Sequence, residues 1–199
     1  MKTRYITIER EYGSGGTAIA RQLSKETGIP CYGREILENV AAKYNVSISD
    51  IENYEENVTG SFLYSLFALS KLGNTNTNML TPEGNLFIEE QEAIKNLARK
   101  GSAIFLGHCA SETLNNCDGL VRIFIRCSDY EQKKDRISKE YGIPEADIEN
   151  IRKKFDKKRA NYYHANTSQK WDDFRNYDIV LDSAKLGEDT CVKVLKACL

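Results

Sequence analysis

A glycine-rich segment near the start of the chain has the composition of a phosphate-binding loop. Residues 10–17 read Arg-Glu-Tyr-Gly-Ser-Gly-Gly-Thr and follow an apolar run directly. Small residues allow backbone N–H groups to surround phosphate oxygens, and the N-terminus of a following helix adds partial positive charge. The pattern predicts an anion-binding loop, and a tight strand-to-helix turn without a ligand is the alternative. The residues expected to hold phosphate are Gly13, Ser14, Gly15, Gly16 and Thr17.

The loop departs from the usual phosphate-loop pattern G-x-x-x-x-G-K-[ST] at two positions. Gly15 and Thr17 keep the last glycine and the hydroxyl, but Arg10 stands at the first glycine and Gly16 at the lysine. That lysine normally neutralises charge on the β- and γ-phosphates. We expect a guanidinium to supply the charge instead, from Arg10 or, as the second choice, from Arg21.

A basic segment later in the chain has the spacing of an anion clamp. Residues 151–159 contain six basic side chains and one acidic one. Arg152, Asp156 and Arg159 are spaced i, i+4 and i+7 and therefore share one face of a helix. Two arginines beside an aspartate could hold a phosphate and a ribose hydroxyl. The alternative is a solvated basic helix face.

The composition limits the class of protein. The chain has 199 residues, 28 basic and 29 acidic, with a net charge of -1 and 41% hydrophobic residues. This is a globular balance, far less basic than is typical of general nucleic-acid-binding proteins, and no apolar run is long enough for a membrane span. The six cysteines include no C-x-x-C pair. We therefore expect a reduced, cytoplasmic protein that binds neither nucleic acid nor membrane.

Short apolar runs alternate with helical patterns, as in a parallel α/β sheet. Strands are expected at residues 4–8, 29–32, 102–106, 120–125 and 178–181. The first helix should run through Ile19 and Leu23 and end near Gly28. Residues 47–98 look largely helical, and 144–163 form a second helical segment. Two apolar stripes mark the first of these segments, one of Phe62, Leu66, Leu69 and Leu72, the other of Leu86, Glu90, Ile94 and Leu97.

Taken together, these segments resemble the cytidylate kinase-like branch of the nucleoside monophosphate kinases. Residues 6–16 are similar to its lysine-less loop, and residues 32–37 to its Y-D-R-E-[IL]-L segment, with Gly33 at the aspartate. Residues 103–110 resemble its apolar strand that ends in G-R-x-A, and residues 177–183 its closing strand. Arg152, Asp156 and Arg159 match its R-x-x-x-D-x-x-R lid helix.

The resemblance implies a single P-loop domain over residues 1–199, with a five-stranded parallel sheet flanked by helices. A helical substrate-binding insertion would lie within residues 33–98 and a lid within residues 140–170. The implied reaction transfers a phosphoryl group from ATP, with Mg²⁺, to a nucleotide-like or other small acceptor. Arg10, Arg152 and Arg159 would be catalytic, residues 13–17 would hold ATP, and Thr17 would face the metal. Arg34, His108 and Asp156 would contact the acceptor.

The acceptor site departs from the family pattern. Gly107, His108 and Cys109 stand where typical members have G-R-D, whose arginine contacts the CMP phosphate and whose aspartate reads cytosine. We therefore expect CMP to be a poor acceptor. His108 could still donate to an anion, or its ring could be satisfied by backbone. A non-catalytic nucleotide- or anion-binding protein and a kinase for a non-nucleotide molecule remain alternatives, and the oligomeric state is not predicted.

Overall fold

The apolar runs form one parallel sheet in the computed structural model, which describes residues 3–44 and 82–199. The strands are β1 (Tyr5–Arg10), β2 (Cys31–Tyr32), β3 (Ala103–Leu106), β4 (Leu120–Arg126) and β5 (Ile179–Asp182). Their order is β2-β3-β1-β4-β5, and every neighbouring pair is parallel. The α/β class and the five-stranded sheet predicted from the sequence are confirmed.

The central strand β1 is a topological switch point, because the chain continues to β2 and β3 on one side of it and to β4 and β5 on the other. It pairs with β3 on one side and β4 on the other, so that Ile8 lies opposite both Leu106 and Ile123. In open α/β sheets, ligands bind outside the carboxyl ends of the strands at such a switch point. The glycine-rich loop leaves β1 at this position.

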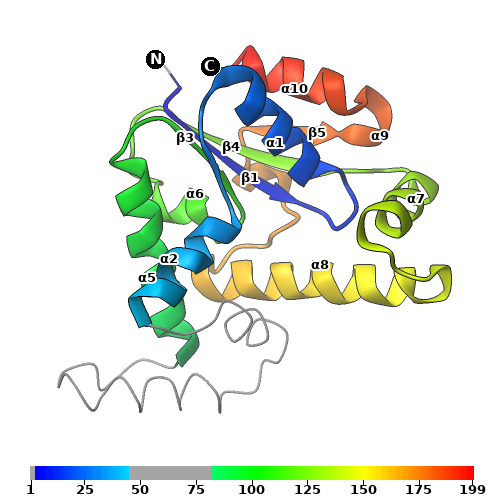
Figure 1. Cartoon of the computed structure of the whole chain (residues 1–199), viewed down its shortest axis with the longest axis horizontal. Coiled ribbons are helices and arrows are strands. Elements are labelled where there is room, and N and C mark those ends of the chain that lie inside the picture. The colour runs from blue at the N-terminus through cyan, green and yellow to red at the C-terminus, as the bar shows by residue number, and fades with distance from the viewer. Residues whose placement is uncertain (1–2, 45–81) are drawn as a thin grey trace.

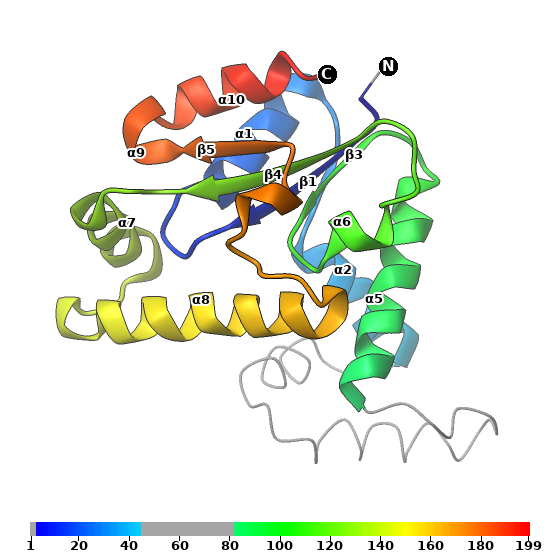
Figure 2. The ribbon, with the colours of Figure 1, turned by 180° about the vertical axis from the view of Figure 1, so that it is seen from behind.

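Helices cover both faces of the sheet (Figures 1 and 2). A hydrophobic cluster lies between the sheet and the helices on each face. Ile6 and Ile8 of β1 pack against α1 (Gly16–Thr27) and α10 (Glu188–Lys196). Tyr5 points the other way, because successive strand residues face opposite sides. The second face is covered by α2 (Arg34–Tyr44), α5 (Pro82–Ala98) and the short α6 (Ala110–Thr113).

Two further helices lie at the carboxyl side of the sheet. The first, α7 (Tyr130–Tyr141), begins at Asp129, whose carboxylate accepts from the Gln132 N–H at 3.1 Å. The second, α8 (Glu145–Thr167), runs from α7 towards α5 (Figure 1). A short 3-10 turn (Phe174–Asn176) and α9 (Ser183–Leu186) flank β5. Both α7 and α8 are therefore placed to contact the loop after β1.

The structure agrees with most of the elements expected from the sequence. The stripe of Glu90, Ile94 and Leu97 is buried on α5, and α8 contains the expected 144–163 segment. The helix α7 was not predicted, since its helical pattern is mostly charged. The stripe of Phe62, Leu66, Leu69 and Leu72 lies outside the described residues.

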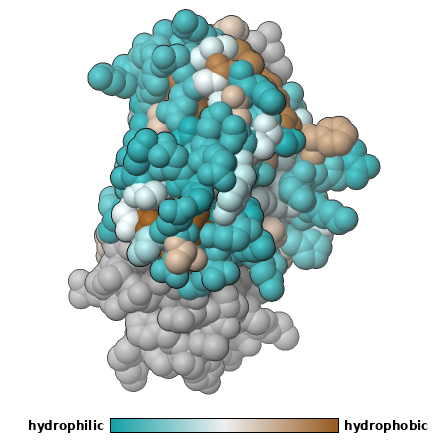
Figure 3. All heavy atoms as spheres, turned by 90° about the vertical axis from the view of Figure 1, so that its right-hand side faces the viewer, coloured by the Kyte–Doolittle hydropathy of each residue, from teal (hydrophilic) through white to brown (hydrophobic). Residues whose placement is uncertain are grey.

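The surface of the described residues is polar on the side nearest α7. In Figure 3 this side is mainly hydrophilic, with apolar residues in small separate groups. None of the described helices is long and apolar enough to cross a membrane.

Candidate functional site

The loop between β1 and α1 owes its shape to two glycines and a buried serine. Gly13 and Gly15 have φ angles of 74° and 77°, which side chains with a Cβ rarely adopt. Ser14 is fully buried, its N–H donates to the Glu11 carbonyl at 3.2 Å, and its carbonyl accepts from the Ser183 hydroxyl at 2.7 Å. The backbone thus forms a hydrogen-bonded turn directly before α1 begins.

Several backbone donors of this loop have no acceptor within the described part of the chain. They are the N–H groups of Gly15, Thr17 and Ala18, at the N-terminus of α1. One donor is used internally, because the Gly16 N–H lies 3.3 Å from the Ser14 hydroxyl oxygen. Free amides at a helix N-terminus suit phosphate oxygens. The Thr17 hydroxyl makes no hydrogen bond among the described residues either and suits a Mg²⁺ ligand, so the loop fits a magnesium–nucleotide complex.

The side chain of Arg10 lies between two glycines. A Cβ on Gly16 would lie 2.7 Å from the Arg10 Cβ and 2.9 Å from its Cγ. A Cβ on Gly107 would lie 2.7 Å from the Arg10 Nη1. The stem of the arginine therefore occupies the space that a lysine at position 16 would need, and its guanidinium reaches the end of β3. Arg21, the second candidate for the missing charge, is exposed on α1.

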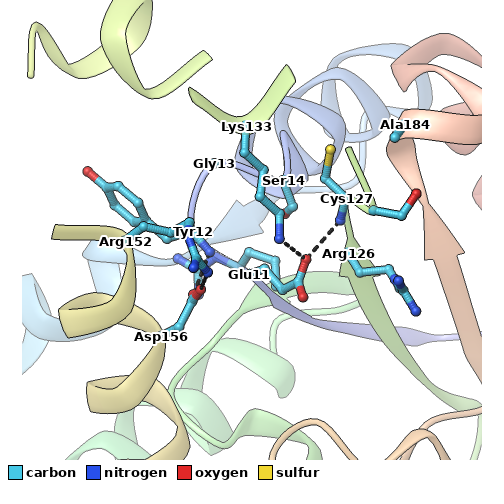
Figure 4. Close-up of polar contacts among 12 residues, drawn as sticks. Glu11, Tyr12, Gly13, Ser14, Arg126, Cys127, Lys133, Arg152, Asp156 and Ala184 are labelled. Atoms are coloured by element: carbon cyan, nitrogen blue, oxygen red, sulfur yellow. Dashed lines mark hydrogen bonds and ion pairs between the residues drawn. The ribbon is translucent and has the colours of Figure 1, made fainter. Parts of the chain in front are cut away.

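Helix α7 holds the outside of the loop through charged groups. The Lys133 ammonium lies 2.8 Å from a Glu11 carboxylate oxygen that also accepts from the Cys127 N–H at 2.9 Å (Figure 4). Arg136 donates to the Gly13 carbonyl at 2.6 Å and to Glu188 at 3.1 Å. These contacts bind the outer carbonyl and the flanking carboxylate, which leaves the inner amides for a ligand.

Helix α8 contacts the loop through two of the predicted lid residues. Asp156 accepts from the Tyr12 N–H at 2.7 Å, and Arg159 donates to the Arg10 carbonyl at 2.9 Å. Arg152 lies one turn earlier and donates to Glu149 at 2.9 Å and to Asp156 at 3.4 Å. The helix segment 151–159 is therefore more than a solvated face, because Asp156 and Arg159 bond directly to the glycine-rich loop.

Aromatic stacking adds to this contact. The Tyr12 ring stacks on Phe155 of α8 at 4.7 Å and on Tyr141 of α7 at 5.1 Å, and the Arg159 guanidinium lies 5.6 Å from its centroid. Burial raises the pKa of Tyr12 to about 12. Burial also raises the pKa of Asp156, against the opposing effects of the Tyr12 N–H and Arg159. The loop and the two helices form one packed unit.

A second group of polar side chains lies at the end of β3. Gly107, His108 and Cys109 have consecutive φ angles of 80°, 59° and 50°. The His108 Nδ1 lies 3.2 Å from Oε1 of Glu90, which is fully buried on α5. The other oxygen of Glu90 accepts from the Tyr162 hydroxyl of α8. The Arg10 guanidinium lies beside Gly107, the residue directly before His108, where a Cβ would meet it.

The structure brings most of the predicted site residues to one edge of the sheet. Arg10 packs beside Gly16 and its carbonyl accepts from Arg159. Asp156 accepts from the Tyr12 N–H and is bonded to Arg152, and His108 follows the glycine beside Arg10. Arg34 lies at the start of α2 with an exposed side chain, 3.6 Å from Glu38. His164 is exposed, as expected for a surface residue.

Sequence reasoning missed the residues that brace the loop and the end of β3. These are Glu11, Glu90, Lys133, Arg136, Tyr162 and Ser183. Asp129 before a run of helix-forming residues was an available signal for α7 and its lysine. The partners of Glu90 and Ser183 come from distant segments, and no local pattern indicates them.

The Lys133–Glu11 pair gives a stability prediction. Lys133→Met should lower the free energy of unfolding by about 2 kcal/mol, because the half-buried Glu11 would lose its counter-ion. Lys134→Met is the matched control: the Lys134 side chain is more exposed and pairs with Glu131 and Glu145, so its loss should cost less than about 1 kcal/mol. Urea unfolding monitored by circular dichroism measures both, and equal losses would contradict the bracing role.

Tyr12 gives a prediction for alkaline pH. The pKa of Tyr12 is about 12 in the folded protein, whereas an unperturbed tyrosine has a pKa of 10.0. Unfolding between these pH values therefore releases a proton, so this contribution to stability is complete below pH 10 and is lost as pH rises. Tyr12→Phe should match the wild type at pH 8 and lose less stability between pH 10 and 12. Parallel unfolding curves for the two proteins over that range would refute it.

Metal and disulfide chemistry are not indicated by the cysteines. All six are free thiols, and among the described residues no three histidine, cysteine, aspartate or glutamate side chains form a metal-binding group.

Comparison with known proteins shows which structures share this architecture. A search of curated proteins found no significant match. An uncharacterized protein from Eubacterium ventriosum has a similar structure, with a TM-score of 0.72, 26% identity, and coverage of 97% of this chain and 96% of that one. A shikimate kinase from Bacteroides thetaiotaomicron aligns with a TM-score of 0.53 at 10% identity over 97% and 96% of the chains. A sugar kinase from Janibacter sp. aligns with a TM-score of 0.50 at 15% identity over 98% and 93%.

These kinases share the fold of the chain, which confirms the predicted P-loop architecture. The model of the cytidylate kinase-like family matches residues 5–185. The family match supports a phosphotransferase. The chain belongs to the cytidylate kinase-like family.

Proposed function

We propose that this chain transfers the γ-phosphoryl group of ATP to a small acceptor and that Arg10 performs the charge neutralisation of the missing lysine. The observation that carries this proposal is the packing of the Arg10 stem against Gly16. Arg10 stands at the first glycine of the usual pattern, and its side chain fills the space that a side chain at position 16 would need. The arginine at position 10 and the glycine at position 16 are thus one coupled exchange, which keeps a cation at the loop.

An arginine suits this position for chemical reasons. A guanidinium stays charged at all physiological pH values and binds phosphate in a bidentate manner. The Arg10 side chain starts at the carboxyl end of β1 and extends to Gly107 at the end of β3. Its charge therefore lies between the loop that would hold the donor and the strand end expected to contact the acceptor. A transferring phosphoryl group develops its negative charge in this region.

The remaining residues divide the work of binding and positioning. The N–H groups of Gly15, Thr17 and Ala18 would hold phosphate oxygens, and Thr17 would also contact Mg²⁺. ATP with Mg²⁺ supplies the phosphoryl group and part of the charge neutralisation. Arg159 joins the lid helix to the loop and would add positive charge as the site closes. Arg34, Arg152 and Asp156 are proposed to orient substrates.

Exchanging the two residues tests the proposal. Arg10→Gly should weaken ATP binding at least about 10-fold, a loss of roughly 1.4 kcal/mol. Gly16→Lys alone should bind ATP poorly and lose about 1–3 kcal/mol of stability, because its Cβ would overlap the Arg10 stem. The double variant R10G/G16K has the full G-x-x-x-x-G-K-T pattern and should regain both stability and affinity. Calorimetric titration with Mg-ATP and thermal unfolding measure the two quantities.

Two results would count against the exchange. If R10G binds ATP as tightly as the wild type, Arg10 does not replace the lysine. If the double variant is no better than G16K, the two positions act independently. ATP binding by the wild type with no turnover on any acceptor would favour the alternative of a non-catalytic nucleotide-binding protein.

The lid residues give a separate prediction. Arg159→Glu should weaken Mg-ATP binding about 10-fold or more, since it removes a cation bonded to the loop and adds a negative charge. Lys153→Glu makes the same charge change on the same helix, at a side chain that is 68% exposed and pairs with Glu149. That control should alter the affinity less than about 2-fold, because exposed charges are screened. Equal effects in calorimetry would mean that only the net charge of the helix matters.

A further inference from the structure

The peptide group between Ser14 and Gly15 carries two polar groups in different surroundings. The Ser14 carbonyl accepts from the Ser183 hydroxyl at 2.7 Å, and among the described residues no other donor bonds to it. The Gly15 N–H has no acceptor in the described part of the chain. A trans peptide is planar, so its C=O and N–H bonds point in opposite directions. The bond from Ser183 therefore fixes the direction in which the Gly15 N–H points.

The backbone of Gly15 does not by itself select this direction. Gly15 has a φ of 77°, and glycine adopts positive and negative φ about equally, so the Ser14–Gly15 peptide can turn over at little steric cost. A Cβ on Gly15 would lie 2.5 Å from a Glu188 carboxylate oxygen, so the position has no room for a side chain that would limit this freedom. A peptide that turned over would present a carbonyl oxygen to the ligand in place of an N–H. A phosphate would then meet a partial negative charge.

Segments from both ends of the sheet's last two strands fix the position of the Ser183 hydroxyl. Ser183 directly follows β5, is 2% exposed and begins α9. The carboxylate of Asp182 caps this turn and also accepts from the Ser128 N–H at 3.0 Å, which joins the turn to the segment after β4. The hydroxyl oxygen also lies 3.1 Å from the Arg126 carbonyl at the end of β4. Because a hydroxyl has one hydrogen and the Ser14 carbonyl is nearer, the loop is its main acceptor.

We propose that Ser183 is a positioning residue for the phosphates of the donor. Its hydroxyl keeps the Ser14–Gly15 peptide in the orientation that turns the Gly15 N–H towards the anion. This proposal rests on the proposed phosphotransfer function, in which the loop holds ATP. Ser183 does not touch the ligand and acts through one backbone group of the loop. A donor that already has the bound orientation gives a higher affinity than one that must first turn.

The loss of this hydroxyl should therefore affect more than one hydrogen bond. The fully buried Ser14 would keep a carbonyl without a donor, which is costly. If the peptide turned over, this carbonyl would reach water on the side where Thr17 and Ala18 are half-exposed. The free protein would then populate mainly the orientation that opposes phosphate, and binding would have to reverse it.

Three substitutions test the proposal by calorimetric titration with Mg-ATP. Ser183→Ala removes the hydroxyl and should weaken binding about 10-fold. Ser183→Thr restores a hydroxyl and should bind within about 3-fold of the wild type, the difference arising from its added methyl group. Ser24→Ala is the matched control, because it removes a hydroxyl that donates to the Ile29 carbonyl at 2.6 Å, at the opposite end of α1. Its affinity should stay within about 2-fold of the wild type, since the two sites are distant.

A spectroscopic measurement separates this role from a general loss of stability. In proton–nitrogen correlation spectra, Mg-ATP should move the Gly15 amide proton of the wild type and of Ser183→Thr downfield, because the N–H gains a charged acceptor. In Ser183→Ala this shift should be absent or much smaller. Ser183→Cys keeps the size of the side chain but offers only a weak donor, so it should show the same losses and replaces the alanine variant if that variant does not fold.

The outcomes distinguish this inference from the proposed function. If the wild type does not bind Mg-ATP, the proposed function fails, and this inference fails with it. If the wild type binds Mg-ATP and S183A or S183C binds it as tightly, only the role of Ser183 is overturned. Equal weakening by S183A and S24A, or an unchanged shift of the Gly15 amide in S183A, would overturn that role as well.

Discussion

The structure depends on how one loop satisfies its backbone groups. A phosphate-binding turn needs unbonded N–H donors inside, yet it must stay ordered, and buried polar groups without partners are costly. Here the outward groups carry the bonds: the Gly13 carbonyl to Arg136, the Ser14 carbonyl to Ser183 and the Tyr12 N–H to Asp156. The N–H donors at the start of α1 thereby stay available for a ligand. Arg136 of α7 and Asp156 of α8 stabilise the turn from outside.

This bracing links the glycine-rich loop to α8 and, through α8, to the end of β3. Helix α8 contacts the loop through Asp156 and Arg159 and reaches Glu90 through Tyr162. Tyr162 lies six positions after Asp156 on the helix, a rise of about 9 Å. A single helix thus connects the glycine-rich loop with the carboxylate beside His108. A displacement of α8 would change both of these contacts together, as the proposed closure of the site requires.

The exchange at positions 10 and 16 shows that the positions of side chains in space matter more than their order in a motif. In the sequence alone, the loop lacks the lysine of the usual pattern and has an arginine at an unrelated position. In three dimensions the arginine stem lies where the Cβ of that lysine would be, and Gly107 makes room for its guanidinium. The proposed exchange keeps a cation at the loop, and it depends on Gly16 and Gly107 having no side chain where the arginine passes.

The amino-acid sequence alone determined the sheet, the glycine-rich turn after β1 and the shared face of Arg152, Asp156 and Arg159, because strand burial, glycine conformations and helical periodicity are local properties. It also led to the proposal of Arg10 as the replacement cation, since the residue ends β1. Only the tertiary structure decided which side chains meet at the loop and at the end of β3. Lys133 with Glu11, and Glu90 with His108 and Tyr162, join segments far apart in the chain. Such pairs arise from the packing of helices across the carboxyl edge of the sheet, and that packing leaves no periodic trace in any one segment.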